Sequence, residues 1–230
     1  SAGPAGAAPF AARLERQATA DALAFDVEAP AIRIAGCLDG RRGLPHLSQE
    51  QQRALRGGAL VQAQDLSGHC GSGYAVVEVG VPKDFMLDIL SKFDEYERMI
   101  PVVRKSEVVS ASSGGQGLES ARCHYSVSKF GIGVLANHQV DRAAGTIRFE
   151  LAHENLSWIL QGAAGAWQVE DLESGRSRVW FNIDVTASSF VPQAMLDYAA
   201  EHALKRATSW LKPHAEMSWA KEQVAIAAVA

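Results

Sequence analysis

Residues 102–186 alternate between apolar and polar side chains in short segments separated by glycine-containing turns. An alternation with a period of two indicates strands with one buried face, and turns this short favour antiparallel neighbours. With one earlier segment, the predicted strands are residues 74–81, 102–111, 118–129, 134–141, 146–152, 162–171 and 178–186. About six to seven strands in this order predict an antiparallel meander, which must bury one face of its sheet.

The periodicity changes after the last predicted strand. Residues 191–211 are the longest segment with helical periodicity, with Pro192 suited to a first turn and Pro213 expected to end the helix. Charged residues share one side of this helix. The opposite, apolar side consists of Leu196, Ala199, Ala203, Ala207 and Trp210. We therefore expect the helix to lay its alanine-rich side against the buried face of the sheet.

Two short helices are predicted directly after the first strand, at residues 84–93 and 94–100. Pro82 ends the strand before them and Pro101 ends the second helix. The resulting order predicts an α+β protein. Its curved antiparallel sheet of about six to seven strands would wrap round one long C-terminal helix.

Three regions follow from the distribution of turn residues and periodicity. Residues 1–46 are rich in alanine, glycine and proline, and we interpret them as an N-terminal extension that is partly irregular. Residues 47–213 form the predicted domain, which opens with a short surface helix whose Ser48 and Gln51 fit a capping box. Residues 214–230 are an apolar tail, predicted as a last helix or a partner-binding strip.

Composition excludes some classes of function. The net charge of −4 and the pI near 6.0 give no electrostatic reason to expect nucleic-acid binding. No apolar run approaches the roughly 20 residues of a membrane-spanning helix, although transient membrane contact stays open. The three cysteines suggest a reducing compartment. We expect an intracellular location, cytoplasmic or organellar, with a plastid possible if the N-terminus is a processed transit-peptide junction.

The segment from Val81 to Pro101, in which a strand is followed by a helix, a tyrosine and a proline, resembles the START, Bet v 1 and polyketide-cyclase superfamily. Gly165-Ala-Trp167 is similar to the penultimate hairpin of that superfamily, and Phe190-Val-Pro192 is similar to the start of its last helix. The resemblance covers roughly residues 58–213. It implies a helix-grip fold that encloses a cavity for an apolar ligand, in carriers and in cyclases or dehydratases.

The ligand site expected from this resemblance lies between the alanine-rich helix face and the inward residues of the sheet. Small residues on that face allow two interpretations, close helix–sheet packing or a ligand cavity. The resemblance favours the cavity. The predicted ligand-binding residues are Tyr96, Met99, Tyr125, His138, Phe149, Trp167, Phe181, Met195, Ala199, His202 and Ala203.

His138 is the candidate catalytic residue because it falls in the apolar phase of its strand. It is either a satisfied core histidine or a group that moves a proton or donates a hydrogen bond to a ligand carbonyl. Tyr125 on the neighbouring strand would hold a ligand oxygen or pack as a half-buried aromatic. His202 would line the site or lie on the surface, and Tyr96 and Met99 would gate the cavity or hold the short helices in place.

No metal site and no cofactor are expected. His153 and Glu154 lack the second histidine of the zinc motif His-Glu-x-x-His, and the short glycine turns are explained by hairpins. The primary hypothesis is binding or transfer of a hydrophobic small molecule, such as a lipid, isoprenoid, quinone or pigment precursor. The alternatives are a cyclase or dehydratase that uses His138, and an accessory protein that acts through its terminal extensions, including a protein partner on the tail.

Overall fold

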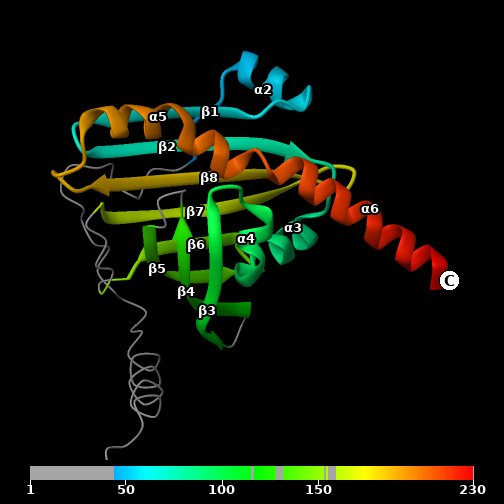
Figure 1. Cartoon of the computed structure of the whole chain (residues 1–230). Coiled ribbons are helices and arrows are strands. Elements are labelled where there is room, and N and C mark those ends of the chain that lie inside the picture. The colour runs from blue at the N-terminus through cyan, green and yellow to red at the C-terminus, as the bar shows by residue number, and fades with distance from the viewer. Residues whose placement is uncertain (1–43, 115–116, 128–131, 153, 155–158, 230) are drawn as a thin grey trace, which may run out of the picture. The chain divides into compact units, whose positions relative to one another are not determined.

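Eight antiparallel strands form one curved sheet in the computed structural model (Figure 1). The structure describes residues 44–114, 117–127, 132–152, 154 and 159–229, all of which belong to one compact unit. The strands lie in the order β1-β2-β8-β7-β6-β5-β4-β3. Their bounds are β1 (Val61–Ser67), β2 (Cys70–Val79), β3 (Val103–Ser113), β4 (Leu118–Val127), β5 (Ile132–Asp141), β6 (Thr146–Leu151), β7 (Leu160–Leu172) and β8 (Arg176–Ala187).

The predicted α+β meander is confirmed, with one strand more than expected. β1 was missed, and it pairs with β2 from Val61 opposite Val76 to Ser67 opposite Cys70. The two short helices therefore follow the second strand and not the first. The predicted N-terminal extension lies outside the described residues except for residues 44–46.

Six helical segments accompany the sheet in the described part of the chain. They are α2 (Gln49–Arg56), α3 (Lys83–Leu90), the 3₁₀ turn η1 (Phe93–Glu95), α4 (Tyr96–Met99), α5 (Gln193–Thr208) and α6 (Leu211–Val229). The predicted capping box of α2 is confirmed, because the Ser48 hydroxyl accepts from the Gln51 amide while the Gln51 side chain accepts from the Ser48 amide. The turn between β7 and β8 uses positive φ at Ser174 and Gly175, as the tight hairpin requires.

The concave face of the sheet carries the main core. The alternation predicted from the sequence is confirmed, since Cys123, Val140, Ile147, Trp167 and Val179 are all buried on this face. Apolar side chains from α3, η1 and α4 cover them, and Trp210 and Leu211 at the junction of α5 and α6 complete the cluster. A smaller cluster on the other face buries Trp180 and Val76 under Leu55 of α2.

The C-terminal helical region differs from its prediction. Pro213 does not end a helix but occupies the first turn of α6, where its missing N–H would have had no partner within the helix. α5 lies along β1 and β2, and α6 continues past β2 toward α3 (Figure 1). The predicted tail is therefore helical, with Ala215 fully buried in the core and residues 220–228 exposed.

Candidate functional site

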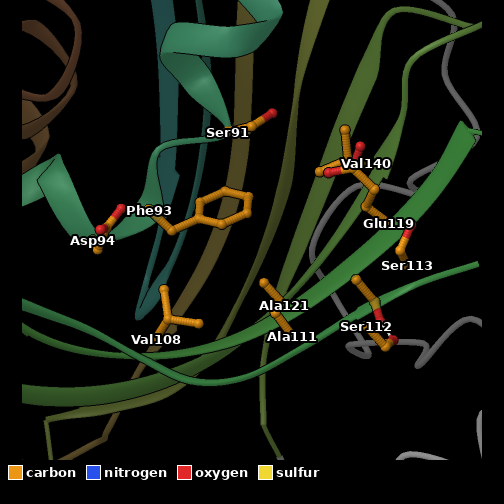
Figure 2. Close-up of a pocket in the computed structure, with 11 residues that line it drawn as sticks. Ser91, Phe93, Asp94, Val108, Ala111, Ser112, Ser113, Glu119, Ala121 and Val140 are labelled. Atoms are coloured by element: carbon orange, nitrogen blue, oxygen red, sulfur yellow. Dashed lines mark hydrogen bonds between the residues drawn. The ribbon is translucent and has the colours of Figure 1, made fainter.

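An open groove of about 490 Å³ lies on the concave face beside the end strand β3 (Figure 2). We call it the edge groove. The segment from the end of α3 into η1 supplies Ser91, Phe93 and Asp94. The remaining lining comes from β3, β4 and β5. The full lining consists of Ser91, Phe93, Asp94, Val108, Ala111, Ser112, Ser113, Glu119, Ser120, Ala121 and Val140.

The floor of the edge groove is apolar and its rim is polar. Ala111 and Ala121 face each other across the β3–β4 ladder, with Val140 on β5 and the half-exposed Val108 nearby. The rim holds serines and two carboxylates, Asp94 and Glu119, and the groove lining contains no basic side chain. Such a surface suits an uncharged apolar molecule better than an anion.

Arg142 fixes one wall of the edge groove. Its guanidinium donates to Glu119 on β4 at 2.8 Å and to Asp88 on α3 at 2.7 Å. These hydrogen bonds raise the pKa of Arg142, first through Glu119 and then through Asp88. Arg142 thereby connects α3, one of the helices that cover the concave face, to β4 beside the groove.

Tyr125 and His138 form a buried polar pair next to the edge groove. The Tyr125 hydroxyl and Nε2 of His138 are 3.0 Å apart, on the neighbouring strands β4 and β5. Burial lowers the pKa of His138 to about 4, so its imidazole is neutral at pH 7. Burial also raises the pKa of Tyr125, with smaller contributions from Tyr96 and Cys123, so its phenol stays protonated.

Phe93 stands between this pair and the edge groove. Its ring stacks on the His138 imidazole, with 4.3 Å between ring centroids and 27° between planes, and the same side chain lines the groove. Ala121, the β4 residue that pairs with His138 in the sheet register, also lines the groove. The predicted acid–base residue is therefore adjacent to the groove but covered.

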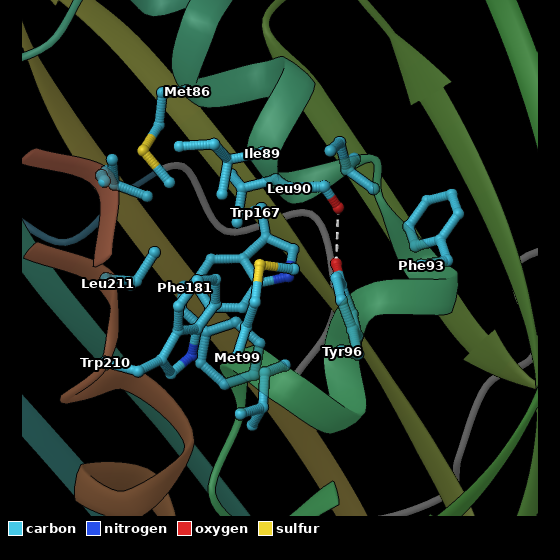
Figure 3. Packing of buried hydrophobic residues seen from close by; sticks show 14 of the residues in the cluster. Met86, Ile89, Leu90, Phe93, Tyr96, Met99, Trp167, Phe181, Trp210 and Leu211 are labelled. Carbon is cyan, nitrogen blue, oxygen red and sulfur yellow. Dashed lines mark hydrogen bonds between the residues drawn. The ribbon is translucent and has the colours of Figure 1, made fainter. Parts of the chain in front are cut away.

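The interior that was predicted as the ligand cavity is occupied by packed side chains (Figure 3). Trp167 lies 4.3 Å from Phe181 between ring centroids, and Phe149 stacks on Phe181 at 5.9 Å. Met99 and Tyr96 are buried in the same cluster. The Tyr96 hydroxyl donates to the carbonyl of Leu90 at 2.6 Å, so here it fastens α4 to α3.

The prediction for the face of α5 is confirmed at Leu196 and wrong at Ala199 and Ala203. Ala199 and Ala203 are exposed, Met195 is 40 % exposed and His202 is half-buried at the helix flank. The buried side of α5 carries Leu196, as predicted, but with Leu204 and Thr208 in place of these alanines. The structure therefore brings together seven of the predicted ligand-binding residues, and the four on α5 do not join them. The shared set is Tyr96, Met99, Tyr125, His138, Phe149, Trp167 and Phe181.

The sequence interpretation missed the lining of the edge groove. Ala121 and Val140 could have been found, because both belong to the inward phase of their strands. Ala111 and Val108 could not, because β3 shifts its register between Val108 and Ser110. Such an irregularity changes which side chains face inward and is invisible to a count of alternating residues.

In the described part of the chain, no group of three His, Cys, Asp or Glu side chains is placed to hold a metal ion. None of the described helices combines the length and apolarity needed to cross a membrane. The predicted protein contact through residues 214–230 stays a prediction.

Searches against known proteins found similarity in structure only. No family model matches the chain, and no curated protein matches it significantly. A START superfamily protein from Mycobacterium smegmatis is 18 % identical, with a TM-score of 0.52 over 65 % of this chain and 99 % of that protein. A STAR-related lipid transfer protein from Xanthomonas axonopodis is 14 % identical, with a TM-score of 0.51 over 68 % of this chain and 98 % of that one.

The Zhui aromatase/cyclase from a Streptomyces species is 18 % identical with a TM-score of 0.48, over 72 % of this chain and 96 % of that chain. The arrangement shared with the Mycobacterium and Xanthomonas proteins confirms the fold predicted from residues 81–101 and from the strand order. The chain therefore has the helix-grip fold of START superfamily proteins.

Proposed function

We propose that this protein binds an uncharged apolar small molecule in the edge groove. The observation that carries the proposal is the groove itself, with an apolar floor of alanines and valines, a phenylalanine wall and no basic side chain in its lining. Removing apolar surface from water supplies the affinity, at about 25 cal/mol per Å². The Xanthomonas neighbour is a STAR-related lipid transfer protein, which is consistent with this class of ligand.

The low pKa of His138 and its burial under Phe93 favour binding over catalysis. A histidine whose pKa is lowered to about 4 by burial is a weak base at neutral pH, and Phe93 covers it. A cyclase or dehydratase activity at His138 therefore stays the alternative. It would require turnover that His138→Ala abolishes while the fold is retained.

The test is a fluorescence titration with N-phenyl-1-naphthylamine, an uncharged apolar dye whose emission rises in an apolar site. Ala111→Trp places an indole on the floor of the groove at an exposed position of β3, where the fold tolerates it. We expect at least tenfold weaker dye binding in this variant than in the wild type.

Ala199→Trp is the matched control, because it makes the same substitution on the exposed face of α5 that the sequence had suggested as the pocket wall. We expect it to bind the dye as the wild type does. Loss of binding in Ala199→Trp with retention in Ala111→Trp would move the site to α5 and refute the edge groove.

A further inference from the structure

His138 carries a buried nitrogen that the fold does not satisfy. The side chain is 5 % exposed, and its Nδ1 has no hydrogen-bond partner among the described residues. Its other nitrogen, Nε2, is engaged by the Tyr125 hydroxyl. An unpaired buried polar atom destabilises a fold, so such an atom beside a groove calls for an explanation.

The hydrogen bond with Tyr125 determines whether Nδ1 carries a hydrogen and can act as a donor. Tyr125 and His138 are both neutral, so one hydrogen lies between them and the imidazole carries one ring hydrogen. A phenol is a stronger donor than a neutral imidazole N–H, and an unprotonated imidazole nitrogen is a stronger acceptor than a phenol oxygen. Donation from Tyr125 to Nε2 is thus the favoured arrangement, and it leaves the ring hydrogen on Nδ1 as an unused donor.

Phe93 lies between His138 and the edge groove. The ring of Phe93 stacks on the face of the imidazole. The same ring lines the edge groove (Figure 2). Its residue lies in the 3₁₀ turn η1, which has no side-chain cap at its N-terminus. The Nδ1 hydrogen lies in the plane of the imidazole, so a ligand from the groove has to pass beside Phe93 and approach the imidazole at its edge.

Resting on the proposed function, we propose that His138 donates its Nδ1 hydrogen to a carbonyl oxygen of an uncharged ligand that passes Phe93 and meets the edge of the imidazole. The preferred ligand class is thus an apolar ketone, aldehyde or quinone and not a plain hydrocarbon. Asp94 on the rim disfavours a carboxylate in the same place, because like charges repel.

The test compares two compounds of nearly the same shape, tetralin and 1-tetralone, which differ by a single ketone oxygen. Both compete with N-phenyl-1-naphthylamine for the wild-type protein. We expect 1-tetralone to bind about tenfold more tightly than tetralin, the usual effect of one hydrogen bond to an otherwise unpaired buried group. In His138→Phe, which keeps a ring under Phe93, the two compounds should bind equally.

The competition distinguishes a failure of the role of His138 from a failure of the edge groove as the binding site. Equal displacement by both compounds from the wild type would overturn the role of His138 and leave the edge groove as the binding site. Displacement by neither compound, together with an unchanged dye titration in Ala111→Trp, would overturn the proposed function as well.

A second measurement does not depend on a variant that folds. Nuclear magnetic resonance of protein labelled with ¹⁵N-histidine reports which ring nitrogen carries the hydrogen. We expect Nδ1 of His138 to carry it in the free protein and its resonance to shift with 1-tetralone but not with tetralin. A hydrogen on Nε2 in the free protein would refute the proposal.

Discussion

The indole of Trp219 meets the ring of Phe85 edge-on, with ring centroids 4.8 Å apart and planes at 60°. Trp219 belongs to α6 and Phe85 to α3, two helices separated by most of the sheet in the sequence. α3 also supplies Met86, Leu87, Ile89 and Leu90 to the core on the concave face. The aromatic pair therefore connects the C-terminal helix to the helical cover of that face.

Trp219→Ala should lower the free energy of unfolding by about 2 kcal/mol, through lost burial and the lost aromatic contact. Chemical denaturation followed by circular dichroism measures the change. Met217→Ala on the same helix is the control, because Met217 is 53 % exposed, and it should change stability by less than about 0.5 kcal/mol. Equal effects of the two variants would mean that α6 is not held through Trp219.

Stability should fall on acidification because His138 is buried in its neutral form. The unfolded chain takes up a proton on this residue near pH 6.5, but the folded chain does so only near pH 4. The contribution of neutral His138 to stability is thus complete above pH 6.5. It is lost as the pH falls from 6.5 to about 4, and the loss is about 3 kcal/mol at most.

Urea denaturation between pH 7 and pH 4 checks this dependence on His138. His138→Phe should have a flatter pH profile than the wild type. Tyr125→Phe keeps the imidazole buried and should retain the steeper profile. Identical slopes in wild type and His138→Phe would show that another group is responsible.

Gly165 should not tolerate a side chain. A Cβ at this position of β7 would clash with the carbonyl oxygen of Asn182 and with the ring of Phe149. We expect Gly165→Ala to cost at least about 2 kcal/mol of stability, since neither backbone nor a packed ring can yield easily. Gly133→Ala on β5 is the matched control, because among the described residues its Cβ would meet only His124 Nε2, at an ordinary 3.4 Å. Thermal unfolding of both variants decides, and equal midpoints would contradict the close approach.

Two arginines compensate the buried negative charge of Glu78. Its carboxylate is 3 % exposed and accepts from Arg176 at 2.6 Å and from Arg178 at 2.8 Å. Replacing both arginines by leucine would strand a buried charge and should cost about 3 kcal/mol or more. Adding Glu78→Leu should recover much of that loss, and chemical denaturation of the double and triple variants tests it. A triple variant less stable than the double would refute the explanation.

The strands and short helices could be predicted because their signals are local. Alternation identifies the inward residues from Cys123 to Val179, and Pro82 and Pro101 bracket the short helices. β1 was missed because Val61-Gln-Ala-Gln-Asp-Leu-Ser67 has one β-branched residue and several polar ones. Its strand conformation comes from the ladder with β2, which no local pattern reveals.

The face of α5 could not be predicted from its alanines, because an alanine fits an exposed position of a helix as well as a buried one. The choice between the side with Ala199 and the side with Leu204 depends on what the helix meets. It meets β1 and β2, and Leu204 is buried there. The wrong face of α5 thus follows from the missed strand β1, because α5 packs on the β1–β2 hairpin, which was not predicted.

His138 was correctly placed in the apolar phase of β5, but its surroundings were beyond the sequence. Its stacking on Phe93 depends on the turn between α3 and α4, where a 3₁₀ segment directs the phenylalanine toward the sheet. A helical wheel drawn through residues 84–93 places Phe93 with the other core residues. It gives no indication that the same ring borders a groove.

The end position of β3 has a consequence for how copies of this protein meet. A terminal strand offers unpaired backbone groups to which another chain could add a strand of its own. Here β3 shifts its register at two places and carries Arg104, Lys105 and Glu107, all exposed. Such kinks and charges discourage edge-to-edge association, so the border of the groove can remain open without becoming a seed for aggregation.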